Sequence, residues 1–318
     1  MKKTKVLVLI VSLLLSILCR EFYKQEYSDV FQVFLMFVTS LYFLPLMFSL
    51  GVKQDLFYAQ NISKTKMGLY VCLLLAPYFF ALFIDNSAAR TLGSNIFFVG
   101  LWCSLALCAW KFEKIKYWLG IALTLSIWFA FELDLLVFWQ GSLYFLNVLL
   151  GIDLVIILFP MFLRFRPFAM EFKMSYLWAK PLHKYSIVFL LVAVPYGLLS
   201  GFLSLKSNID PIQIPIQFLA IFFFNALPEE ILFRGLLQEQ VQRYMKANLA
   251  LLLVSIAFGF AHLNNFPKWD YRFVLISFIA GLCFGIVYLR TRSIVPAALL
   301  HTIINTTNAI AFDKVPLI

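Results

Sequence analysis

The chain has 318 residues, of which 63% are hydrophobic and 13% are charged. Soluble globular domains usually carry about 25% charged residues, and a soluble fold of this length could not bury so much apolar surface. The composition therefore excludes a soluble protein and predicts a membrane protein. The net charge of +10 does not indicate a nucleic-acid-binding protein, because the Lys and Arg residues lie in short clusters between apolar runs.

Apolar runs that can cross, or nearly cross, a hydrocarbon layer of about 30 Å recur along the chain. We expect an all-α, polytopic transmembrane helix bundle of about eleven spans, within a range of ten to twelve. The first run follows three lysines and resembles a signal peptide, but further spans follow, so we expect it to be uncleaved. The expected spans are 6–19, 30–50, 67–84, 94–110, 117–131, 135–163, 186–205, 216–238, 249–263, 273–290 and 294–312.

The basic residues lie mainly in alternate connecting segments, which predicts a cytoplasmic N-terminus and an odd number of spans. The segment 164–185 is basic and contains aromatic residues such as Tyr176 and Trp178, so we expect a linker on the cytoplasmic leaflet. It divides an N-terminal transmembrane region, 1–163, to which the sequence assigns no role, from a C-terminal transmembrane domain, 186–312.

The span 216–238 contains three charged residues, Glu229, Glu230 and Arg234. Ionisable residues inside a span are costly and are therefore candidates for function. Glu230 and Arg234 are one helical turn apart and can pair, whereas Glu229 points in another direction. Pro228 kinks this helix or starts a new one, which Asn225 could cap. A structural ion pair with one satisfied carboxylate explains this segment alone equally well.

Two later spans place further polar residues at helical spacing. Phe258 and His262 are four residues apart at the end of one span, and His301 and Asn305 are four apart in the last span. A single histidine at the end of a span is more often an interfacial or hydrogen-bonded residue than a catalytic one. Together with the glutamate pair, however, these residues make a purely structural explanation improbable.

The depth of these residues allows them to meet. A rise of 1.5 Å per residue places Glu229, His262 and His301 roughly 12–20 Å into the layer, so they can share one cavity. Gly281 and Gly285 form a pair of small residues that permits close helix packing just before the last span.

Three motifs occur in order: Glu-Glu-x-x-x-Arg, Phe-x-x-x-His and His-x-x-x-Asn. This series resembles the CPBP (Abi) family, which includes the type 2 CAAX prenyl proteases and bacteriocin-processing or immunity proteins. The resemblance covers about 186–312 and not the first 185 residues. The matching residues are Glu229, Glu230, Arg234, Phe258, His262, His301 and Asn305.

The resemblance implies a glutamate-type intramembrane endopeptidase. Peptide hydrolysis needs an activated water and stabilisation of an oxyanion. The resemblance assigns Glu229 as the base, assisted by His262, and assigns His301 and Asn305 to the oxyanion. It assigns supporting roles to Glu230, Arg234 and Phe258.

A metalloprotease is the alternative mechanism, with zinc held by Glu229, His262 and His301. The chain has no His-Glu-x-x-His motif, and none of its five cysteines forms a CxxC pair. We therefore expect no cofactor and keep zinc as the alternative.

The expected partners are the lipid bilayer and a membrane-associated protein or peptide, such as a CAAX-like protein, a sorting tag or a leader peptide; no nucleic acid is expected. We expect a multi-pass protein of the plasma (inner) membrane, of bacterial type. Two other functions stay open: a non-catalytic bacteriocin-immunity or scaffold protein, and a proton-coupled transporter. A transporter should show paired repeats, whereas the polar residues here crowd into one half of the chain.

Overall fold

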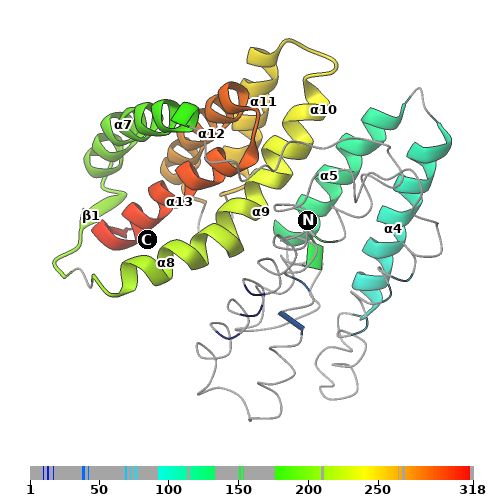
Figure 1. The fold of residues 1–318 in the computed structure, drawn as a ribbon, viewed down its shortest axis with the longest axis horizontal. Helices are drawn as coiled ribbons and strands as arrows, with labels where there is room; N and C mark the ends of the chain where they lie inside the picture. Colours follow the sequence, from blue (N-terminus) through cyan, green and yellow to red (C-terminus); the bar gives the residue numbers. More distant parts are fainter. Residues whose placement is uncertain are drawn as a thin grey trace. The chain divides into compact units, whose positions relative to one another are not determined.

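The computed structural model describes residues 92–112, 115–132, 176–208, 211–263, 265–266 and 269–315, with isolated residues between 10 and 153. The chain divides into two compact units, Met1–Phe172 and Lys173–Ile318. The division falls within the segment 164–185 that the sequence predicts as a linker. Figure 1 shows the helices of both units.

The described part of the first unit contains two apolar helices that pack against each other, α4 (Leu92–Lys111) and α5 (Lys116–Glu132). They correspond to the predicted spans 94–110 and 117–131. The predicted spans 6–19, 30–50, 67–84 and 135–163 lie outside the described residues apart from isolated positions. The count of eleven spans therefore stays a prediction.

The described part of the second unit is a bundle of five helical segments (Figure 1). The second segment is continuous from Gln213 to Val241, with two π-helical stretches inside it, η4 and η5. The elements are α7 (Tyr176–Leu199), β1 (Leu203–Leu205), α8 (Gln213–Ile221), η4 (Phe222–Ala226), α9 (Leu227–Glu230), η5 (Ile231–Gln238), α10 (Glu239–Val241), α11 (Ala247–Phe260), α12 (Tyr271–Thr291), α13 (Ile294–Ala311) and β2 (Phe312–Lys314).

Among the described residues, four helical segments, all in this unit, are long and apolar enough to cross a membrane: Tyr176–Leu199, Gln213–Val241, Tyr271–Thr291 and Ile294–Ala311. The helix α11 is shorter but also apolar. These helices confirm a multi-pass membrane protein. Large apolar side chains point outward, including Leu191 on α7, as expected for surfaces solvated by lipid.

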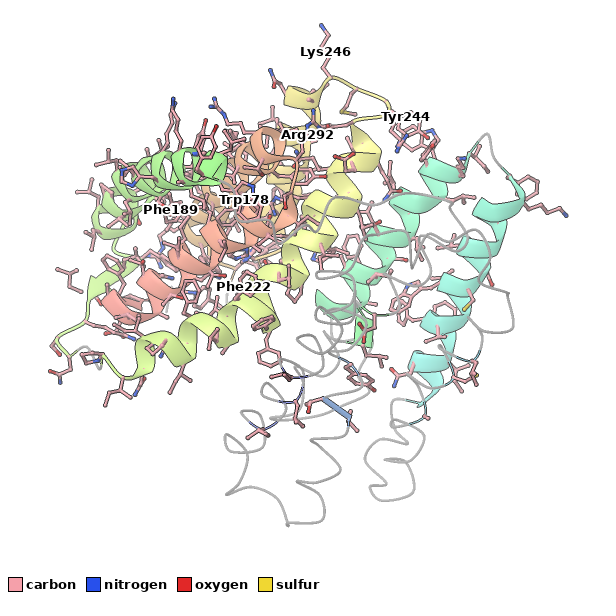
Figure 2. All side chains as sticks on the ribbon, in the orientation of Figure 1. Trp178, Phe189, Phe222, Tyr244, Lys246 and Arg292 are labelled. Atoms are coloured by element: carbon pink, nitrogen blue, oxygen red, sulfur yellow. The ribbon has the colours of Figure 1, made fainter. Side chains whose placement is uncertain are left out.

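The helix α7 begins at Tyr176, so the last part of the predicted linker is helical and the predicted start at 186 is wrong. The physical reason is that Lys180 and Lys184 are exposed at the end of an otherwise apolar helix, where long basic side chains can reach water. Figure 2 shows Lys246 and Arg292 at one end of these helices, as the predicted alternation of spans requires.

The helix α12 packs against α7, α11 and α13. A Cβ atom built on Gly285 would lie 2.3 Å from Leu251 Cδ1, and one on Gly281 would lie 3.3 Å from the Cα atom of Ser255. These close approaches to α11 confirm the packing role predicted for the glycine pair.

A small antiparallel sheet is an element that the all-α prediction lacks. The strands β1 and β2 pair with Leu203 opposite Lys314. Gly201 has a φ of 69° in the turn before β1, a conformation that suits glycine. The sheet joins the turn after α7 to the end of α13, beside the cavity described next.

Candidate active site

A cavity of about 580 Å³ lies within the second unit. Its walls come from α7, the segment Gln213–Val241, α11, α12, α13 and the two strands. The four residues predicted as catalytic, Glu229, His262, His301 and Asn305, all line it. The structure therefore brings together side chains that are separated by more than seventy residues, as the sequence analysis predicts.

Glu229 lies on α9, between the two π-helical stretches. Pro228 has no N–H to donate to the preceding turn, and wider π-helical turns accommodate such interruptions. The Glu229 Oε1 atom accepts a hydrogen bond from the Asn225 side chain. Its Oε2 atom is buried and has no hydrogen-bond partner among the described residues.

The sequence allows Asn225 to cap a new helix that starts at Pro228, but the structure shows no such cap. The residue at the N-cap of α9 is Ala226, and no side chain caps it. The helix instead continues through Pro228, so the Asn225 amide is free to face the cavity. There it donates to Glu229 and accepts, through Oδ1, a 2.8 Å hydrogen bond from the Asn305 Nδ2 atom.

His262 lies in the turn that follows α11, which ends at Phe260, so the predicted end of this span at 263 is too late. Its Nδ1 atom is 2.8 Å from the carbonyl oxygen of Phe258. A carbonyl only accepts, so Nδ1 carries the hydrogen. The other ring nitrogen, Nε2, is 4.0 Å from Glu229 Oε2.

His301 lies on α13 and is buried, with its ring stacked on Phe284 at a centroid distance of 4.4 Å. Its Nδ1 atom is 3.0 Å from Glu230 Oε1. Its Nε2 atom is 4.0 Å from Glu229 Oε2. Both imidazoles are thus held through Nδ1, and both direct Nε2 toward the same carboxylate oxygen.

Glu230 and Arg234 form the predicted ion pair, with Arg234 Nη1 3.1 Å from Glu230 Oε1 and both side chains fully buried. Arg234 Nη2 also donates to the carbonyl oxygen of Gly281 at 2.9 Å. The guanidinium lies over the Phe258 ring, 4.5 Å from its centroid. Phe258 also contacts both histidine rings, so it fills the space between the ion pair and the imidazoles.

Sequence reasoning missed two features of this site. It assigned Glu230 to Arg234 alone, whereas Glu230 also holds His301. It named Asn225 as a cap and not as a cavity residue. The spacing of four between Asn225 and Glu229 is a signal that could have found the second feature, since residues at that spacing share a helix face.

The zinc alternative requires three ligand atoms around one ion. Among the described residues, no group of three or more His, Cys, Asp or Glu side chains is arranged to hold a metal. Two ligand atoms of a tetrahedral zinc ion lie roughly 3.3 Å apart, given bonds of about 2.0–2.1 Å. The 4.0 Å separations here are longer, so these side chains would have to move inward to share an ion.

Residues 211–307 match the family model for type II CAAX prenyl endopeptidase Rce1-like proteins. No curated protein and no solved structure matches the chain. The matched segment contains all seven motif residues and confirms the resemblance drawn from them. It excludes α7 and β2, which line the same cavity. The match supports, in general terms, a membrane protease of the CAAX type.

Proposed function

We propose that this protein is a membrane-embedded endopeptidase that hydrolyses a peptide bond with a water activated by Glu229. The proposal proceeds from the similarity of residues 211–307 to type II CAAX prenyl endopeptidase Rce1-like proteins. The position of the Glu229 carboxylate supports this mechanism. The Glu229 Oε2 atom has no partner among the described residues and is 4.0 Å from the Nε2 atoms of both His262 and His301.

A separation of 4.0 Å is too long for a direct hydrogen bond and suits a bridging water. A water there donates one hydrogen to Glu229 Oε2 and the other to the free lone pair on His262 Nε2. Glu229 removes the first proton as the water oxygen attacks the substrate carbonyl. The same carboxyl group then delivers that proton to the departing amine, which completes hydrolysis.

The oxyanion needs hydrogen-bond donors on the other side of the reacting carbon. Asn305 uses one hydrogen of its Nδ2 group for Asn225 and keeps a second one to donate. His301 donates from Nε2 when both ring nitrogens carry hydrogens. The Glu230 carboxylate beside Nδ1 supplies the negative charge that this form of the imidazole needs.

One feature of the two histidines also fits an alternative, metal-dependent mechanism, although the three side chains would have to move inward to share an ion. Imidazoles that bind a metal through Nε2 usually hold Nδ1–H against a carbonyl or carboxylate. His262 and His301 share this arrangement, with Phe258 and Glu230 as their partners. In such a mechanism Glu229, His262 and His301 would hold zinc, which would supply the activated water.

The test is cleavage of candidate peptides by the purified protein in detergent or lipid nanodiscs. The candidates are a CAAX-like prenylated peptide, a sorting tag and a leader peptide. We expect Glu229→Gln to lower the cleavage rate by about 10²–10⁴-fold, the usual contribution of a general base. Glu239→Gln is the matched control, because Glu239 accepts a 2.7 Å hydrogen bond from Tyr288 and does not line the cavity.

Cleavage by Glu229→Gln at a rate within a few-fold of the wild type would remove Glu229 from the mechanism. A chelator added to the wild-type protein separates the two mechanisms. Unchanged cleavage supports a carboxylate acting on water, whereas a loss of cleavage that added zinc restores supports the metal-dependent mechanism.

We further propose the bacterial plasma membrane as the location. This proposal rests on the composition and on the alternation of basic segments.

A further inference from the structure

Lys314 lies in β2 and lines the cavity that holds the proposed catalytic residues. Its Nζ atom is 4.3 Å from the centroid of the Phe273 ring. The same ring also contacts His262, at a centroid distance of 5.3 Å. A single aromatic ring therefore separates the ammonium group from an imidazole of the site.

The charge of Lys314 is not balanced within the described part of the chain. No described carboxylate lies within 4.0 Å of its Nζ atom. The other lysine that lines the cavity differs, since Lys206 is 3.6 Å from Asp313 and donates to the carbonyl oxygen of Ala309. The side chain of Lys314 is exposed overall, but loss of hydration against the apolar rings lowers the pKa of its ammonium group.

The backbone around Lys314 is held in place. Lys314 pairs with Leu203 across the sheet, and the next residue, Val315, donates to the carbonyl oxygen of Phe202 at 2.8 Å. Arg272 donates to the carbonyl oxygen of Val315 at 2.9 Å and is itself fixed by Asp270 at 2.6 Å. The Lys314 side chain thus extends from a strand whose backbone is fixed by hydrogen bonds, so less backbone conformational entropy is lost when the ammonium group binds an anion.

We propose that Lys314 binds a carboxylate of the peptide substrate and so sets where the peptide is cut. This inference rests on the proposed peptidase function and names a feature of its substrate. The two ring contacts place Nζ within about 10 Å of the His262 ring, a length that about three extended residues cover. The carboxylate is therefore no more than about three residues from the scissile bond, either at the peptide C-terminus or on an acidic side chain.

The experiment measures binding and needs no turnover. The protein carries Glu229→Gln, and the probes are three fluorescein-labelled apolar octapeptides. One ends in a free carboxylate, one in an amide, and one in an amide with glutamate as its last residue. We expect the Kd of the free-acid peptide to be about five- to ten-fold lower than that of the plain amide. A difference of this size lies between the contribution of an exposed ion pair and that of a buried hydrogen bond to a charged group.

Adding Lys314→Met keeps an apolar chain over Phe273 and should abolish this preference. Adding Lys184→Met is the matched control, since Lys184 also lies over an aromatic ring, that of Tyr185, but does not line the cavity. This variant should keep the preference. Tight binding of the glutamate-containing amide would show that Lys314 also accepts the carboxylate of an acidic side chain. Weak binding of this peptide would restrict recognition to the C-terminal carboxylate.

Equal affinity for all three peptides, or a preference that survives Lys314→Met, overturns the inference. Failure of the wild-type protein to cleave any peptide contradicts the proposed function alone, because the affinities are measured on a variant that does not depend on cleavage.

Discussion

Replacing Arg234 with methionine removes a cation from the interior of the second unit. The guanidinium and the Glu230 carboxylate are both fully buried, with 3.1 Å between Nη1 and Oε1, and Nη2 also bonds the Gly281 carbonyl oxygen. Removing one partner of a buried pair costs about 3–5 kcal/mol, because the remaining charge is left without compensation. We expect Arg234→Met to lower the free energy of unfolding by about this amount.

Thermal unfolding in detergent measures the effect. A loss of 1 kcal/mol lowers the Tm by about 2–4 °C in a domain of 150–250 residues, a size close to that of the second unit, so we expect a decrease of roughly 6–20 °C. Arg290→Met is the control. Arg290 is exposed and its guanidinium is 5.6 Å from the Tyr185 ring centroid, a contact worth about 0.5–1 kcal/mol.

Equal decreases in Tm for Arg234→Met and Arg290→Met would refute the reasoning. A second variant strengthens the comparison. Adding Glu230→Gln to Arg234→Met removes the uncompensated charge and should recover part of the lost Tm, whereas two independent sites would lose stability additively.

Three further substitutions, and one control, test the packing and the support of the site. Gly259→Ala should lower stability by about 1–3 kcal/mol in the same melts, because its Cβ atom would lie 2.8 Å from a backbone carbonyl oxygen of α12. Gly100→Ala is the control, because no described residue lies within 4 Å of the added Cβ atom; it should leave stability unchanged or raise it by up to about 1 kcal/mol, and equal losses would contradict the close approach. Asn225→Ala removes a hydrogen bond to Glu229 and should slow peptide cleavage about ten-fold at unchanged Tm, and an unchanged rate would contradict that role. Arg272→Met removes the hydrogen bond to the carbonyl oxygen of Val315, next to Lys314, and should weaken binding of the free-acid peptide more than that of the amide. An equal effect on both peptides would show a merely structural role for Arg272.

The sequence predicts contacts within one helix well, because the number of residues between two side chains determines whether they lie on the same face of the helix. The interval between Glu230 and Arg234 predicts their contact, and the structure shows it. The contact between Glu230 and His301 joins residues 71 positions apart. It depends on how two helices are rotated against each other, which the hydrophobic pattern of apolar spans does not fix, because all faces of such helices are apolar.

The helices themselves follow from hydropathy, because a bilayer requires long apolar helices. The sheet of β1 and β2 could not be predicted, since a strand of three residues is too short to show an alternating pattern. The start of α7 at Tyr176 was also missed, because basic residues in its first turns resemble a connecting segment. The sheet borders the cavity, so this part of the cavity wall is less predictable than the proposed catalytic residues.

The most direct test of the central claim is chemical rescue of Glu229→Ala by formate. The Glu229 side chain lines a cavity of about 580 Å³, where a small carboxylate can replace it once it is removed. We expect the variant to lose peptide cleavage and formate to restore the rate by about ten-fold or more, as for a replaced general base. The His301→Ala variant, which keeps its carboxylate, should not respond to formate. Undiminished cleavage by Glu229→Ala in the absence of formate would contradict the account.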